Sequence, residues 1–398
     1  MTRSSSVSML DLPKPSADAA AHSDRLQRRI AAQIKSAGGW IPFSEYMSQL
    51  LYSPGLGYYS AGAVKFGAQG DFVTASEISP LFARICAGQI DSALRQLGGG
   101  SVLEFGPGTG AFAAEALAEM ARLATPLEEY YLLEISSDLR QRQENLVRLP
   151  PARWLNALPA AFQGVVFANE VLDAMPCERF VMQDGVPWRL GVGLCTGLND
   201  VPTFEWRGRV ADGTCVGDAQ HNAYTARLLQ GCEVRGIELP QSYCGEWHPS
   251  FHPWLTSLAD ILKRGVVLLV DYGLPRAQLF HPDRLEGSLR CHYQHYAHGD
   301  PFFLPGLCDV TAWVDFTSVA EAASVAGFQV SGFTTQMGFL LAGGLDEHYH
   351  SDVSSLAHSV RQLLLPGEMG ESVKFLALTK NCELELSAFA LQDLRRSL

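Results

Sequence analysis

Short apolar segments alternate with longer amphipathic ones between Ser101 and Ala168. The apolar segments have the length of buried strands, and the longer ones repeat apolar residues at helical spacing. Strands and helices that alternate in this way form parallel β-α-β units with right-handed crossovers. The pattern predicts the strands Ser101–Phe105, Tyr130–Glu134, Arg153–Leu155 and Val165–Ala168 and the helices Ala111–Leu123 and Asp138–Leu149.

The alternation stops after Pro176 and resumes near Pro253. Between these points, Arg179–Val210 has the pattern of β-hairpins, with Asp184-Gly185 as a turn signal. We interpret residues 177–249 as a β-rich insertion after the fourth strand. The resumed pattern predicts the helices Pro253–Lys263 and Asp315–Ala326 and the strands Val266–Asp271, Phe328–Thr334 and Val373–Thr379.

The residues before the first strand follow a different pattern. Residues 1–22 are rich in Ser, Ala and Pro and lack the apolar segment of a secretory signal, so they predict a disordered leader. Residues 53–70 interleave glycines with aromatic residues, which is typical of an ordered loop rather than a helix or strand. We expect residues 23–100 to form an N-terminal extension whose loop covers a ligand. Its predicted helices are Ser23–Ala37, Pro42–Leu51 and Ser79–Leu97.

Composition and charge exclude several classes of binding partner and of structural site. The chain has 398 residues, of which 47% are hydrophobic, and a net charge of −12, so we expect a large core and no nucleic-acid partner. Its nine cysteines include no C-x-x-C pair, so we expect neither a disulfide framework nor a metal site. No apolar segment approaches the roughly 18 residues of a membrane span. The oligomeric state stays open.

The segment Glu104–Gly110 follows a predicted strand and opens a predicted helix. Its glycines, Gly106, Gly108 and Gly110, allow a tight turn and close approach of the backbone to a ligand. The helix N-terminus favours a negative group such as a carboxylate. Glu104 could bind the ammonium group of an amino-acid cofactor. Because Gly106, Gly108 and Ala111 also fit G-x-G-x-x-A, the glycines alone leave a dinucleotide cofactor open.

Two further strand ends carry acidic and amide side chains. Glu134 ends the next strand, where a carboxylate would accept the ribose hydroxyls of either cofactor. The fourth strand leads into Asn169, Glu170 and Asp173, at the sheet edge where α/β proteins bind ligands. Glu170 and Asp173 would share a face if this turn were helical. We therefore predict that Asn169 and Glu134 contact the cofactor and that Glu170 and Asp173 are catalytic.

Several longer motifs resemble those of the MidA family of methyltransferases. The resemblance spans about Gly39 to Thr379 and covers most of the chain. The motifs are Gly55–Tyr59, Gly70–Ser79, Glu104–Gly110, Asn169–Pro176, Val270–Gly273, Gly287–Gln294, Asp300–Phe302 and Asp309–Phe316.

This resemblance implies a Rossmann-like class I methyltransferase fold, with a mostly parallel seven-stranded sheet in residues 101–398, and S-adenosylmethionine as the cofactor. Asp71 and Thr74, in the covering loop, are expected to contact that cofactor. The mitochondrial member of the family is an assembly factor for respiratory complex I and is credited with dimethylating an arginine of one of its subunits. A protein substrate of this kind is therefore expected, in a bacterial cytoplasm or a mitochondrial matrix.

An arginine acceptor would give Glu170 and Asp173 definite roles. The sulfonium and the guanidinium are both cations, so nearby carboxylates are needed to hold them together. One carboxylate would clamp the guanidinium and take its proton during transfer. Two alternatives remain: a non-catalytic assembly chaperone that keeps the pocket, and a nucleotide-dependent oxidoreductase.

The histidines His292, His295 and His298 lie close together in the sequence. No carboxylate or cysteine nearby completes a set of metal ligands, and the segment lacks a helical pattern. We therefore expect this segment to be a polar loop on the substrate side.

Overall fold

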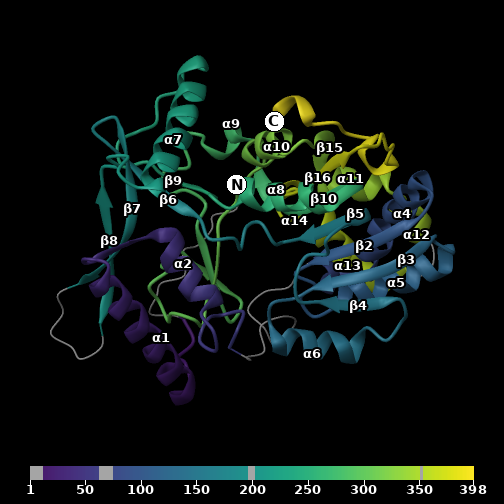
Figure 1. The fold of residues 1–398 in the computed structure, drawn as a ribbon, viewed down its shortest axis with the longest axis horizontal. Helices are drawn as coiled ribbons and strands as arrows, with labels where there is room; N and C mark the ends of the chain where they lie inside the picture. The colour runs from purple at the N-terminus through teal and green to yellow at the C-terminus, as the bar shows by residue number, and fades with distance from the viewer. Residues whose placement is uncertain (1–11, 62–74, 196–201, 350–352) are drawn as a thin grey trace.

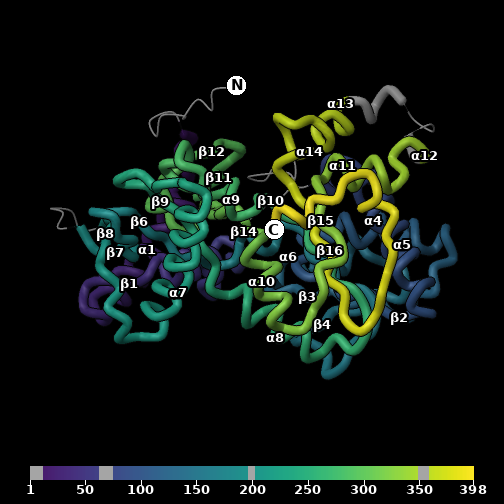
Figure 2. Tube along the Cα trace, turned by 90° about the horizontal axis from the view of Figure 1, so that it is seen from above, coloured from purple at the N-terminus to yellow at the C-terminus, as the bar shows by residue number. Residues whose placement is uncertain are grey.

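The computed structural model describes residues 12–61, 75–195, 202–349 and 353–398. Its elements form two groups that lie side by side in both views (Figures 1 and 2). One group is built on the central sheet. The other group, here called the second lobe, combines the N-terminal helices with two later segments of the chain. In the described part of the chain, no helix has both the length and the apolar character needed to cross a membrane.

The central sheet consists of β2 (Gly100–Phe105), β3 (Leu127–Leu133), β4 (Ala152–Leu155), β5 (Phe162–Asn169), β10 (Leu262–Leu274), β14 (Val314–Asp315), β15 (Gln329–Thr335) and β16 (Val373–Lys380). Its strand order is β15-β16-β10-β5-β2-β3-β4, and the short β14 pairs with the end of β10. The five strands from β10 to β4 are parallel, whereas β16 is antiparallel to both neighbours. This confirms the predicted α/β fold with a mostly parallel sheet.

Helices pack on both faces of this sheet because its strands are apolar on both sides. In β10, for example, Val266 and Leu268 belong to one core and Val267 and Leu269 to the other. The first core lies under α4 (Pro80–Leu97), α5 (Ala111–Leu123), α11 (Gln336–Ala342), α13 (Val353–Leu364) and α14 (Met369–Ser372), and the second under α8 (Phe251–Ile261) and α10 (Phe316–Val325). The remaining helices of this group are α3 (Ala75–Ile78), α6 (Ser137–Leu146), α9 (Arg276–Leu279) and α12 (Leu345–Tyr349).

The second lobe has its own apolar core, formed by segments distant in sequence. Leu26 of the first helix, Tyr46 of the second and Val192 of the inserted sheet all belong to it. The residues of the predicted insertion thus pack with the N-terminal helices. The lobe contains α1 (Ala17–Ser36), α2 (Phe43–Tyr52), α7 (Val216–Val234), β1 (Trp40–Pro42), β6 (Glu178–Gln183), β7 (Val186–Cys195), β8 (Thr203–Arg209), β9 (Cys244–Trp247), β11 (Arg290–Tyr293), β12 (Tyr296–His298) and β13 (Asp309–Thr311).

The structure corrects one boundary and adds one helix that the sequence pattern did not predict. Helix α1 begins at Ala17, after Ser16, whose side chain accepts a hydrogen bond from the Ala19 amide, so the predicted leader is too long at its end. The insertion is β-rich as predicted, with β6 and β7 joined at Asp184-Gly185, but it also contains the 19-residue helix α7. The apolar residues of α7 do not line up on one face of the helix, so their spacing in the sequence gives no helical signal.

Candidate active site

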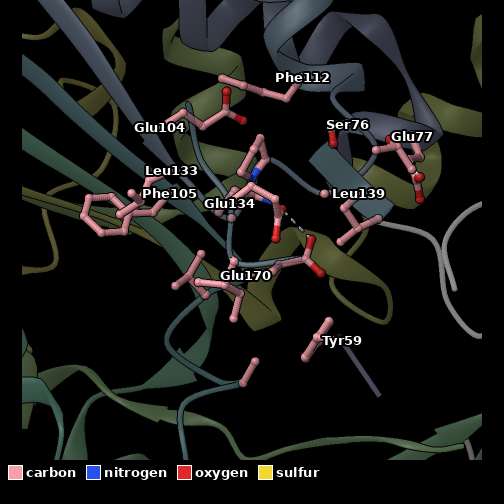
Figure 3. A pocket seen from close by; sticks show the side chains of 18 of the residues that line it. Tyr59, Ser76, Glu77, Glu104, Phe105, Phe112, Leu133, Glu134, Leu139 and Glu170 are labelled. Atoms are coloured by element: carbon pink, nitrogen blue, oxygen red, sulfur yellow. Dashed lines mark hydrogen bonds between the residues drawn. The ribbon is translucent and has the colours of Figure 1, made fainter. Parts of the chain in front are cut away.

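A pocket opens at the carboxyl ends of β2, β3 and β5. It is lined on one side by the glycine segment and on the other by residues of the second lobe. Figure 3 shows Glu104 and Phe112 at one end of the pocket and Tyr59 at the other, beyond Glu170. The structure therefore brings together the three strand ends that the sequence pattern selected.

The glycine segment turns sharply between β2 and α5. Gly106, Gly108 and Gly110 have φ angles of 56°, 55° and 86°, a region that favours glycine. Gly106 and Gly108 line the pocket. A Cβ atom on Gly108 would meet no protein atom within 4 Å, so the space beside it is open. Gly110 instead caps α5, and a Cβ there would lie 3.2 Å from Gln143.

Glu104 lies at the end of β2 and is almost fully buried, 3% exposed, although it lines the pocket. The Tyr130 hydroxyl donates a 2.7 Å hydrogen bond to its Oε2. Burial raises the pKa of Glu104 to about 8, despite the opposing effect of that hydrogen bond. A buried carboxylate held in this way gains most from a cation placed beside it.

Glu134, at the end of β3, is held in place by its neighbours. Its Oε1 accepts a 2.7 Å hydrogen bond from the Ser136 amide, and its Oε2 accepts one of 3.0 Å from Gln143. Gln143 also donates to the Gly108 carbonyl over 2.8 Å and accepts from Trp154 over 3.0 Å. Gln143 is fully buried on α6, and no pattern in the sequence pointed to it.

Beyond β5 the chain does not form the helical turn that the spacing of Glu170 and Asp173 suggested. Glu170 has a φ of 52°, an uncommon conformation for a residue with a Cβ, and its amide donates to Val270 over 2.8 Å. The side chain of Glu170 lines the pocket with Asn169. Burial and the neighbouring Asp271 carboxylate raise the pKa of Glu170 to about 8. The Asn169 Oδ1 is buried without a hydrogen-bond partner.

Asp173 is buried behind the pocket wall that Asn169 and Glu170 form, and it does not line the pocket. Burial, and then the carboxylates of Asp271 and Glu170, raise its pKa. Asp271 is fully buried, and its Oδ2 accepts hydrogen bonds from the amides of Leu172, over 2.8 Å, and Asp173, over 3.3 Å. Asp271 thus fixes the segment that carries both candidate catalytic carboxylates.

The N-terminal segment also contributes to the pocket. Tyr52 and Tyr59 line it from the second lobe, and Ser76 and Glu77 line it from α3. Thr109 donates a 3.3 Å hydrogen bond to Glu77, which joins this segment to the glycine turn. The predicted cofactor contacts Asp71 and Thr74 lie outside the described residues.

The histidine cluster lies in the second lobe. His292 is on β11 and His298 on β12, with His295 in the turn between them. Among the residues that the structure describes, no set of three or more His, Cys, Asp or Glu is arranged to hold a metal ion.

Residues 81–334 match the model of a protein family described as "Putative S-adenosyl-L-methionine-dependent methyltransferase". The chain belongs to this family. The family resemblance inferred from the motifs is thereby confirmed, and the family match favours a methyltransferase over the oxidoreductase alternative. A crystal structure from Burkholderia thailandensis, described as a "likely methyl transferase" bound to S-adenosyl-homocysteine, is 39% identical, with a TM-score of 0.88, over 98% of this chain and 100% of that one.

Curated relatives are more distant but extend over nearly the whole chain. A Drosophila melanogaster protein named "Protein arginine methyltransferase NDUFAF7 homolog, mitochondrial" is 26% identical over 92% of this chain and 87% of its own length. The human "Protein arginine methyltransferase NDUFAF7, mitochondrial" is 25% identical over 90% of this chain and 84% of its own length. The similarity therefore includes both the central sheet and the second lobe.

Proposed function

We propose that this protein transfers a methyl group from S-adenosylmethionine to an arginine side chain of a protein. The observation that carries the proposal is the position of Glu170. Its backbone has an uncommon conformation, and its side chain lines the pocket between the proposed cofactor end and the second lobe. The names of the relatives and the ligand of the Burkholderia structure support the same reaction.

The residues of the pocket fit this cofactor. Glu104 would pair with its ammonium group, and the amides that begin α5 would face its carboxylate. Glu134 would accept the ribose hydroxyls. Ile135, which is 75% exposed and lines the pocket, offers apolar surface to the purine. The unpartnered Asn169 Oδ1 would accept a hydrogen bond from a ligand.

When bound, S-adenosylmethionine supplies a methyl group on a sulfonium: the S–CH₃ bond breaks as an N–CH₃ bond forms, and the acceptor nitrogen loses a proton. The chain mainly aligns the two reactants. Glu170 would hold the guanidinium by charge-assisted hydrogen bonds and accept the proton at a carboxylate oxygen. Asp173 does not line the pocket, so it would act without contacting the acceptor.

The motif resemblance also indicates which protein accepts the methyl group. We infer a protein acceptor, with a subunit of respiratory complex I as the first candidate. The relatives named above are mitochondrial proteins, so the matrix is the compartment we propose for a eukaryotic source and the cytoplasm for a bacterial one.

The proposal is tested in a lysate of cells from which the gene has been deleted. Isotopically labelled S-adenosylmethionine is added with wild-type protein, with Glu170→Gln, or with Glu383→Gln, whose carboxylate is exposed. We expect labelled methylarginine with the wild type and Glu383→Gln, and its loss with Glu170→Gln. Label on another residue type would refute the arginine acceptor. Cofactor binding without any protein-dependent label would favour the assembly chaperone.

A further inference from the structure

Two aromatic rings of the second lobe form part of the pocket wall. Tyr52 ends α2, and Tyr59 follows it in the loop. Their ring centroids lie 5.6 Å apart with an interplanar angle of 22°, so the two rings are stacked. Both residues precede residue 81, where the family match begins. The second lobe therefore contributes directly to the site.

Hydrogen bonds fix both rings in place. The Tyr52 hydroxyl donates to the Ala174 carbonyl over 2.9 Å, and the Tyr59 hydroxyl donates to Oδ1 of Asp309 over 2.9 Å. The first bond ties α2 to the segment that carries Glu170 and Asp173. The second ties the loop to β13. Rings held in this way present a preorganised apolar surface to a ligand.

Several buried carboxyl groups surround these rings. After burial itself, the carboxylates of Asp309 and Asp173 raise the pKa of the Tyr52 hydroxyl. Within the described ranges, neither Glu170 nor Asp173 forms an ion pair with a lysine or arginine. Burial without a cationic partner favours the protonated form of these groups, and a ligand that carries positive charge would stabilise the ionised form instead.

We propose that Tyr52, Tyr59 and Glu170 form an acceptor subsite that selects a guanidinium group over an ammonium group. A guanidinium is planar, so it can stack on an aromatic face while its edge pairs with a carboxylate. An ammonium group is compact and strongly hydrated and can make the ion pair but not the stack. This inference rests on the proposed methyl transfer and assigns the choice of acceptor to the second lobe.

Calorimetry on the protein saturated with S-adenosyl-homocysteine tests the subsite. The probes are N-acetyl-L-arginine amide and N-acetyl-L-lysine amide. We expect the arginine probe to bind several-fold more tightly than the lysine probe. Tyr59→Leu and Tyr52→Leu should each weaken arginine-probe binding by roughly tenfold, because the stacking surface is lost. Tyr59→Phe keeps the ring and should retain most of that affinity. Tyr296→Leu, which replaces an exposed ring of the same lobe, serves as the control.

The outcomes separate this subsite from the proposed function. Equal affinities for the two probes, or no binding of either, would overturn the subsite in the wild type without any variant. Unchanged arginine-probe affinity in folded Tyr59→Leu and Tyr52→Leu would overturn it too. Failure of the wild type to bind S-adenosyl-homocysteine would instead overturn the proposed methyl transfer.

Discussion

Gln143 donates a hydrogen bond from Nε2 to Oε2 of Glu134 over 3.0 Å, and the same nitrogen donates to the Gly108 carbonyl over 2.8 Å. One buried amide therefore links the acidic end of β3 to the glycine turn after β2. Trp154 donates to the other end of that amide over 3.0 Å, which fixes its orientation. The two parts of the proposed cofactor site are thus held in register by a residue that does not line the pocket.

Gln143→Glu should weaken binding of S-adenosyl-homocysteine by roughly tenfold or more. The replacement has the same shape, but its carboxylate cannot donate to Glu134 or Gly108 and repels the former. Calorimetry measures the effect. Gln96→Glu, a change of the same kind at an exposed helical glutamine, is the matched control. An unchanged dissociation constant for folded Gln143→Glu would show that the link is not needed for binding.

Gly108→Ala should abolish or strongly weaken cofactor binding while the protein still folds. A Cβ atom at this position meets no protein atom, so it projects into the space that we assign to the ligand. An alanine at this position would also be strained, because a φ near 55° is unfavourable for a residue with a Cβ atom. Gly185→Ala controls for that strain, because Gly185 has a φ of 75° and open space in a distant hairpin turn. If both variants bound S-adenosyl-homocysteine equally well, Gly108 would not border the cofactor.

Sequence patterns predicted the part of the fold that depends on local periodicity. The strands that end at Phe105 and Asn169 are apolar on both faces, and the glycine turn between β2 and α5 follows from its composition. The second lobe could not be predicted in this way, because residues such as Leu26 and Val192 meet only in the tertiary structure. Helix α7 was missed because its apolar residues do not form a stripe.

The candidate site shows the same division. Glu104, Glu134 and Glu170 were predicted because each lies at or next to the end of a predicted strand, and parallel strands bring their carboxyl ends to one edge. Gln143 and Asp271 were not assigned their roles, because a buried hydrogen-bond acceptor or donor leaves no signal in spacing. The placement of Asp173 behind the wall depends on the left-handed conformation of Glu170, which the sequence does not reveal for a residue other than glycine.

Asp271→Asn should lower the rate of methyl transfer at saturating cofactor by roughly tenfold while leaving S-adenosyl-homocysteine binding nearly unchanged. The Asp271 carboxylate accepts from the amides of Leu172 and Asp173, and the asparagine would place an N–H group among these donors. The segment that carries Glu170 would then lose its fixed position, which affects alignment more than cofactor affinity.

This prediction separates a positioning role from a general loss of stability. Transfer is followed with the lysate acceptor, and Asp260→Asn, on the exposed face of α8, is the control. A general loss of stability would lower the amount of folded protein and affect binding and transfer alike. An Asp271→Asn variant with full transfer rate would remove Asp271 from the alignment of the site.

Glu170→Gln should become more stable relative to the wild type as the pH rises from about 5 to 8. The ordinary pKa of a glutamate is 4.5, and burial followed by the Asp271 carboxylate raises that of Glu170 to about 8. Between these values the folded protein binds a proton that the unfolded chain has released, so this group's contribution to stability falls as the pH increases. A glutamine at this position stays neutral, so the variant does not lose this stability as the pH rises. Thermal melting at pH 5, 6.5 and 8 measures the difference, with the exposed Glu383→Gln as the control. Melting temperatures of Glu170→Gln and the wild type that change in parallel across this range would show that Glu170 is not held protonated in the folded protein.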